Sequence, residues 1–329
     1  HEILAKGGNA FDAAIAVAAT LAVVEPTSSG LGGGGFWMVH RAEDGFETMI
    51  DAREVAPAAA NQDMYLGEDG KVNRDLARNG PLAGGIPGEV AGMEHLAKHY
   101  GRLPLAVSLQ PAIRIAREGF AVDEKFLVLM GWRIETIKRW PAAAQAYLVD
   151  DEMPPLGHVI KLPDLAWVLE QVAEHGANGF YHGPVAEKLV KGVRDAGGIW
   201  SMEDLAAYRV QERDPIRTMF GGYELVTAPP PSSGGIAIAE ILNILEPFAV
   251  NELDPVLRTH LVVEAMRRAY RDRAIYLGDP DFVEMPIDML TSPHYADGLR
   301  ASIRPDRATP SSMLAGNEPL REGTDTTHY

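Results

Sequence analysis

The hydrophobic pattern of the chain begins with a long apolar helix. Residues 10–24 are polar only at Asp12 and Thr20, which predicts a helix buried on nearly all sides. Asn9 follows two glycines and is the expected cap at the start of this helix, and Pro26 ends it.

A β-hairpin is predicted next. Residues 36–40 and 46–50 have strand-like compositions, and Asp44-Gly45 between them is a typical turn. Glycines crowd residues 30–35, directly before the first strand. A phosphate-binding loop instead follows a strand and opens a helix, and no Lys-Ser or Lys-Thr is present here, which argues against a nucleotide site. The glycines predict either a backbone that approaches another group closely or a tightly packed turn.

The rest of the chain reads as mostly helical. A helical middle region is expected at about residues 86–208, including a helix at 89–99. Two strands around Gly221-Gly222 should pair, and helices are expected at 236–245 and about 255–277. The segment at about 310–329 is polar and is expected to be exposed.

Composition restricts the possible partners. The 329 residues include 46 acidic and 30 basic side chains, and the net charge of -16 disfavours nucleic acid and anionic lipid as partners. Without cysteine there is no disulfide, thiolate metal site or cysteine nucleophile. The longest apolar run, residues 13–24, falls short of the roughly 20 residues that a membrane span needs. No signal peptide precedes His1, but the chain opens in the middle of a helical pattern, so further residues are expected upstream.

Three groups of residues are candidates for chemistry. Arg53 follows the second strand, where a guanidinium could grip a carboxylate through two hydrogen bonds, although its acidic neighbours could simply pair with it. His95 and His99 have the spacing of a metal pair but no third ligand, so a solvated helix face is the preferred interpretation. Ser232 and Ser233 lack the Gly-x-Ser-x-Gly context of a nucleophile and are interpreted as loop residues.

The last residues suggest a processing boundary. The chain stops on the polar run Asp325-Thr326-Thr327-His328-Tyr329. A Thr or Ser nucleophile that uses its own α-amino group as the base exists only after the preceding peptide bond is cut. The hypothesis is that Tyr329 is the upstream side of such a cut, with the nucleophile on a partner chain. The alternative is an arbitrary or disordered end.

Several stretches together resemble the large subunit of γ-glutamyltranspeptidase, a self-cleaving N-terminal-nucleophile hydrolase. In the family's order, the matching stretches are Gly7-Gly8-Asn9-Ala10-Phe11-Asp12-Ala13-Ala14, Gly32-Gly33-Gly34-Gly35-Phe36, Asp51-Ala52-Arg53-Glu54-Val55-Ala56-Pro57, Gly88-Glu89-Val90-Ala91-Gly92, Gln110-Pro111-Ala112, Asp204-Leu205-Ala206-Ala207-Tyr208, Pro229-Pro230-Pro231-Ser232-Ser233-Gly234-Gly235, Leu277-Gly278-Asp279-Pro280-Asp281-Phe282 and Thr326-Thr327-His328-Tyr329. They extend over essentially the whole chain.

The resemblance implies an α+β fold, namely the αββα sandwich of the N-terminal-nucleophile hydrolases. Residues 1–329 would be the large subunit of a single domain that a separate small subunit from the same precursor completes. Cleavage after Tyr329 would expose a Thr nucleophile on the small subunit. Arg53 matches the arginine that holds the α-carboxylate of the γ-glutamyl group. No metal or organic cofactor is implied, and bacterial members of the family are usually periplasmic or secreted.

Two alternatives share parts of this interpretation. A cephalosporin acylase of the same superfamily would take a glutaryl or similar acyl group, and the segment around Ser28-Ser29-Gly30-Leu31-Gly32 does not separate the two activities. A non-catalytic member that fails to process would instead be a binding or structural module.

Overall fold

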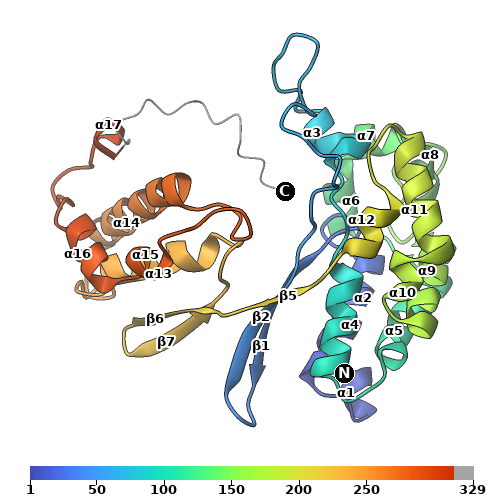
Figure 1. Ribbon diagram of the computed structural model, residues 1–329, viewed down its shortest axis with the longest axis horizontal. Coiled ribbons are helices and arrows are strands. Elements are labelled where there is room, and N and C mark those ends of the chain that lie inside the picture. Colours follow the sequence, from blue (N-terminus) through green and yellow to red (C-terminus); the bar gives the residue numbers. More distant parts are fainter. Residues whose placement is uncertain (315–329) are drawn as a thin grey trace. The chain divides into compact units, whose positions relative to one another are not determined.

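The computed structural model describes residues 1–314 (Figure 1). The chain divides into two compact units, which we call unit 1 (residues 1–35 and 51–211) and unit 2 (residues 36–50 and the chain from 212 onward). That residues 1–329 form one domain with a second subunit stays a prediction.

Unit 1 is mainly helical, as expected for residues 86–208. Its helices, the 3₁₀ turn η1 and the strand pair β3–β4 are α1 (Glu2–Ala5), α2 (Ala10–Val24), α3 (Leu76–Asn79), η1 (Pro81–Ala83), α4 (Glu89–His99), α5 (Leu105–Glu118), β3 (Phe120–Ala121), α6 (Glu124–Gly131), α7 (Ile134–Lys138), α8 (Pro141–Tyr147), β4 (Val159–Ile160), α9 (Pro163–His175), α10 (Asn178–Tyr181), α11 (Gly183–Asp195) and α12 (Met202–Ala207).

Helix α2 begins and ends where the sequence predicts. The side chain of Asn9 accepts hydrogen bonds from the first turn, and Asp12 returns a bond to the Asn9 amide, which completes a capping box. The fully buried Asp12 carboxylate also accepts hydrogen bonds from the amides of Arg102 and Leu103, so it fixes this end of α2 to the segment that leads into α5. The expectation of burial on nearly all sides is wrong for this chain, because Val17 is 56% exposed.

The core of unit 1 forms where α5 packs against α2 and α9, and where α2 packs against α4. Fully buried residues such as Ile15, Leu109 and Leu169 come from three of these helices. Helix α4 carries Val90, Met93 and Leu96 on its buried face. These residues follow one another at intervals of three, which places them on one side of a helix. The start of α4 is thereby held against the core, and this start borders the candidate site.

Unit 2 combines two small sheets with a group of helices. Its elements are β1 (Gly35–Arg41), β2 (Phe46–Ala52), β5 (Gln211–Arg213), β6 (Ile216–Phe220), β7 (Tyr223–Thr227), α13 (Gly234–Leu245), α14 (Pro255–Tyr276), α15 (Ile287–Leu290), α16 (Pro293–Arg300) and α17 (Ser311–Leu314). The first residue of β1, the last two of β2 and the first of β5 belong to unit 1. One sheet has the strand order β1-β2-β5, and the second is the antiparallel pair β6–β7, in which Phe220 faces Tyr223 across the predicted glycine turn.

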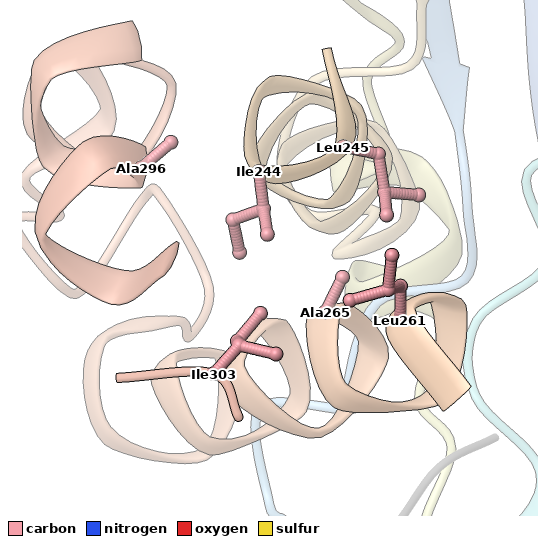
Figure 2. Close-up of a cluster of buried hydrophobic side chains, with 6 residues drawn as sticks. All are labelled: Ile244, Leu245, Leu261, Ala265, Ala296 and Ile303. Atoms are coloured by element: carbon pink, nitrogen blue, oxygen red, sulfur yellow. The ribbon is translucent and has the colours of Figure 1, made fainter. Parts of the chain in front are cut away.

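The helices of unit 2 enclose a hydrophobic cluster (Figure 2). Ile244 and Leu245 from α13 meet Leu261 and Ala265 from α14, and Ala296 from α16 lies on the other side of Ile244. No helix was predicted between residue 277 and the segment at about 310–329, yet α15 and α16 form there. They were missed because short helices with few apolar residues give little periodic signal. Residues 315–329 lie outside the described part of the chain.

Candidate functional site

Arg53 directly follows β2, at the strand end where the sequence predicts it. Its backbone amide donates to the carboxylate of the buried Asp51 at 3.1 Å. Its side-chain Nε lies 3.3 Å from Oε2 of Glu54. The Arg53 side chain is 38% exposed, so its main chain is held on the inside while the guanidinium reaches the surface of unit 1.

The glycine loop, residues 30–35, lies against the backbone of this segment. A methyl group on Gly34 would come within 2.2 Å of the Ala52 carbonyl oxygen. The carbonyl oxygen of Gly33 accepts hydrogen bonds from the amides of Gly88 and Glu89, at 2.9 and 3.0 Å. The predicted close approach is therefore made to the chain's own backbone, and the glycines let three segments meet around Arg53.

Two carboxyl groups give the site its electrostatic character. Glu89 begins α4 and is half-buried, and Glu54 accompanies Arg53. Burial, and secondly the charge of Glu54, raises the pKa of Glu89 to about 7. Both carboxyls border the glycine loop: Glu54 Oε1 lies 3.3 Å from a methyl placed on Gly33, and Glu89 Oε2 lies 3.7 Å from one placed on Gly35. The total charge of this carboxyl pair, of which Glu54 accompanies Arg53, therefore changes near neutral pH.

The segment that carries Arg53 is also held by residues without a role in the sequence interpretation. Tyr208 donates a hydrogen bond from its hydroxyl to the Arg53 carbonyl oxygen at 2.8 Å. Asp204, four residues earlier, accepts one from the Ala58 amide at 2.8 Å. Both belong to the Asp204-Leu205-Ala206-Ala207-Tyr208 stretch that supports the family resemblance. That resemblance was the only available signal, because the contact to Arg53 spans 155 residues of sequence.

His95 and His99 lie next to each other on α4, with ring centroids 4.3 Å apart and ring planes tilted by 31°. Within residues 1–314, no group of three or more His, Asp or Glu residues could hold a metal ion. The two histidines line a cavity of about 340 Å³ together with Lys98, His182 and Arg209. Lys98 and His99 occupy the last turn of α4, and His182 caps the C-terminus of α10. Because basic residues are favoured at helix C-termini, this lining has a structural explanation and does not by itself indicate an anion site.

Ser232 and Ser233 are loop residues in unit 2, in agreement with the sequence interpretation. Ser232 Oγ accepts a hydrogen bond from the Gly234 amide at 3.3 Å, and Ser233 Oγ accepts one from Arg273 Nε at 2.9 Å. The proposed processing residues Thr326, Thr327, His328 and Tyr329 lie outside the described residues. Among the helices of residues 1–314, none combines the length and apolar character needed to cross a membrane.

Comparison with solved structures establishes the fold class. Gamma-glutamyltranspeptidase from Helicobacter pylori superposes with a TM-score of 0.92 and 38% identity, covering 99% of this chain and 93% of that chain. Cephalosporin acylase from Bacillus halodurans superposes with a TM-score of 0.82 and 30% identity, covering 92% of this chain and 57% of that chain. The chain thus has the α+β fold of the N-terminal-nucleophile hydrolases.

Sequence comparison narrows this class to one family. The family described as gamma-glutamyltranspeptidase matches residues 1–329. A glutathione hydrolase proenzyme from Pseudomonas sp. (strain A14) is 41% identical over 331 residues, which is 100% of this chain and 57% of that protein. The chain belongs to the γ-glutamyltranspeptidase family, corresponds to its large-subunit part, and spans somewhat more than half the length of this relative.

Proposed function

We propose that this chain is the large-subunit part of an enzyme that cleaves γ-glutamyl amides such as glutathione. The acyl group would pass to water or to the amine of an amino acid or peptide. Family membership and the relative's name, glutathione hydrolase proenzyme, support this activity. Within the chain, the observation that carries the proposal is the position of Arg53, whose main chain is fixed while its guanidinium is partly exposed.

The reaction proceeds by acyl transfer in two steps. The nucleophile is a Thr on the part of the protein beyond this chain. Its hydroxyl gives its proton to its own α-amino group and attacks the γ-carbonyl carbon; the C–N bond then breaks, and the amine leaves with a proton. Water or an acceptor amine attacks the resulting ester, which releases glutamate or a new γ-glutamyl amide and restores the Thr hydroxyl.

Arg53 contributes positioning rather than bond chemistry. The planar guanidinium matches the geometry of a carboxylate, and two charge-assisted hydrogen bonds fix the direction as well as the place of the bound group. Holding the α-carboxylate places the γ-amide, three carbons away, at a defined distance from the nucleophile.

The first prediction follows from this role. Arg53→Ala in the full precursor should raise KM for a γ-glutamyl anilide by at least about 30-fold, because a hydrogen-bonded charge pair is worth about 2 kcal/mol or more. Arg53→Lys should also bind poorly, since a point charge cannot replace the planar fork. Arg114→Ala is the matched control, because Arg114 is 46% exposed and paired with Glu2 on the same unit. An unchanged KM in a processed Arg53→Ala protein would overturn the role.

The structural match to cephalosporin acylase supports a second candidate. A glutaryl group carries a carboxylate at the same distance from the scissile amide as a γ-glutamyl group, but it lacks the α-amine. Arg53 could therefore hold either acyl group. The ratio of kcat/KM for γ-glutamyl anilide to that for glutaryl anilide separates the candidates, and a ratio below one favours the acylase.

We also propose that the precursor cleaves itself and that the protein is periplasmic or secreted. The word proenzyme in the name of the relative supports processing. A denaturing gel of the purified full-length gene product, together with an activity assay of the same preparation, tests processing. Two bands from an active preparation support the heterodimer, and one full-length band from an inactive preparation supports the non-catalytic module. Fractionation of the native cells tests the location.

A further inference from the structure

The ring of Tyr208 is almost fully buried in unit 1, with 7% of the residue exposed. Tyr208 directly follows the last residue of α12, so the helix fixes the position of its backbone and hence where the side chain begins. Its hydroxyl makes a 2.8 Å hydrogen bond to the carbonyl oxygen of Arg53, the residue whose side chain is assigned to the substrate. Burial raises the pKa of Tyr208, so the phenol keeps its proton and remains a donor at any pH at which the enzyme would work.

Tyr181 holds the ring of Tyr208 in place. The two rings are stacked, with centroids 5.6 Å apart and an interplanar angle of 3°. The hydroxyl of Tyr181 donates to the Pro87 carbonyl oxygen at 2.8 Å and accepts from the Ala91 amide at 3.3 Å. The stacked rings therefore connect the segment after β2 to the turn before α4.

There is little free space around this contact. A methyl group on Gly88 would come within 2.1 Å of both the Tyr208 hydroxyl and the Ala52 carbonyl oxygen. Val55, two residues after Arg53, exchanges two backbone hydrogen bonds with Ile86, at 2.8 and 3.2 Å. The Arg53 main chain is thus fixed from its carbonyl side, and its hydrogen bond with Tyr208 has no room to shift.

We propose that Tyr208, supported by Tyr181, is a positioning residue for the substrate carboxylate: its hydroxyl fixes the main chain of Arg53 and hence the origin of the guanidinium. This inference rests on the proposed function, because it acts through Arg53. The Tyr208 hydroxyl is bonded to the main chain of Arg53, so the role assigned to it is to position the residue that binds the carboxylate. Tyr208 thereby affects the direction in which the Arg53 guanidinium points. This direction matters because a hydrogen bond weakens steeply as its donor–hydrogen–acceptor angle departs from linear.

The test is Tyr208→Phe in the full precursor, assayed with a γ-glutamyl anilide. The variant keeps the stacked ring and removes only the hydroxyl. We expect KM to rise by about 3- to 10-fold, the range for one lost hydrogen bond, while kcat changes by less than about twofold. Tyr65→Phe is the matched control, because it removes another phenol-to-carbonyl bond in unit 1, made at 3.1 Å to Leu82 and not to Arg53. KM should not change in that control.

A double variant separates positioning from a general structural role. In an Arg53→Ala background, Tyr208→Phe should not raise KM further, because the group that it positions is gone. An equal rise in both backgrounds, or an unchanged KM in Tyr208→Phe alone, overturns the inference. If Arg53→Ala itself leaves KM unchanged, the proposed function of Arg53 fails first, and the two failures are distinguishable.

A second variant covers the case in which Tyr208→Phe does not fold or process. Tyr181→Phe keeps both rings and removes the hydrogen bond to Pro87. We expect a smaller rise in KM, about 2- to 5-fold, with processing intact. An unchanged KM in that variant, in soluble processed protein, also overturns the positioning role of the pair.

Discussion

At the scale of single residues, the site shows how a charged side chain becomes a defined donor. Arg53 is accompanied by Glu54 at 3.3 Å, and Glu89 lies close enough to Glu54 for their charges to interact. A guanidinium carries several N–H donors in one plane, so in the proposed role it donates to a substrate carboxylate as well as to Glu54. Ionisation of Glu89 would add a second negative charge near Glu54, and the two charges together would repel an anionic substrate.

This arrangement predicts a pH dependence of substrate binding. Below the Glu89 pKa of about 7 the group is neutral, and above it the group is charged. KM for a γ-glutamyl anilide should therefore rise as pH increases through about 7, and Glu89→Gln should remove that rise. A series of KM measurements between about pH 5.5 and 8.5 tests it. Glu170→Gln, which affects a surface ion pair with Arg117, is the control. The same rise in both variants would contradict the role of Glu89.

Which site residues could be predicted from sequence follows from the range of each signal. Arg53 was found because it directly follows a strand within a recognisable stretch. Glu89 and Tyr208 were missed as functional residues, because their roles depend on contacts with segments distant in sequence. A Glu at the start of a helix and a Tyr directly after a helix are common in proteins, so neither residue indicates a functional role by its local sequence. Only the packing of three backbone segments around Arg53 gives them a role.

At the scale of elements, the local sequence was sufficient to predict the bounds of a helix that has a capping residue or a long apolar face. Helices α2 and α4 have the predicted bounds, and α2 has the predicted Asn9 cap. The pairing of β5 with β2 was not predicted, since a three-residue strand has too short a pattern and its partner lies far away in the chain. The short helices α15 and α16 were missed for the same reason.

The packing of α13 against α14 in unit 2 buries a second carboxyl pair. Glu240 is 1% exposed, and its Oε1 has no hydrogen-bond partner among the described residues. The neighbouring Asp272 accepts hydrogen bonds from Tyr295 and Arg271. Burial, and then the charge of Asp272, raises the pKa of Glu240 to about 8. The two helices therefore pack around a carboxyl group that keeps its proton at neutral pH.

A stability prediction follows, with a definite sign. Because the folded-state pKa of Glu240 exceeds its unfolded value, the folded protein binds the proton more tightly, and this stabilisation is lost as pH rises from about 4.5 to about 8. Glu240→Gln should therefore gain stability relative to wild type across that range, on the order of 2–4 kcal/mol at the upper end. Denaturant unfolding of the purified protein at about pH 5 and 8.5 measures it.

The exposed Glu224 on β7 provides the control for this measurement, because Glu224→Gln changes the same group without burial. A stability difference between Glu240→Gln and wild type that is the same at both pH values would contradict a raised pKa.

At the scale of the whole molecule, the chain carries a family pattern along its full length but corresponds to only part of a longer relative. It matches its family over residues 1–329 and spans 57% of the length of the Pseudomonas sp. (strain A14) relative. The order of motifs along the chain was enough to predict the family and the fold class. The division into two units was not predicted, because each unit is assembled from segments that are not contiguous in sequence.

The central claim is that Arg53 recognises the α-carboxylate, and the most direct test removes each partner in turn. The kcat/KM of wild type and Arg53→Ala is measured with γ-glutamyl anilide and with 4-aminobutyryl anilide, which lacks only that carboxylate. We predict that losing the carboxylate costs wild type about 30-fold or more and costs Arg53→Ala almost nothing, because the interaction is already absent. An equal loss in both proteins would contradict the account and assign the carboxylate to another residue.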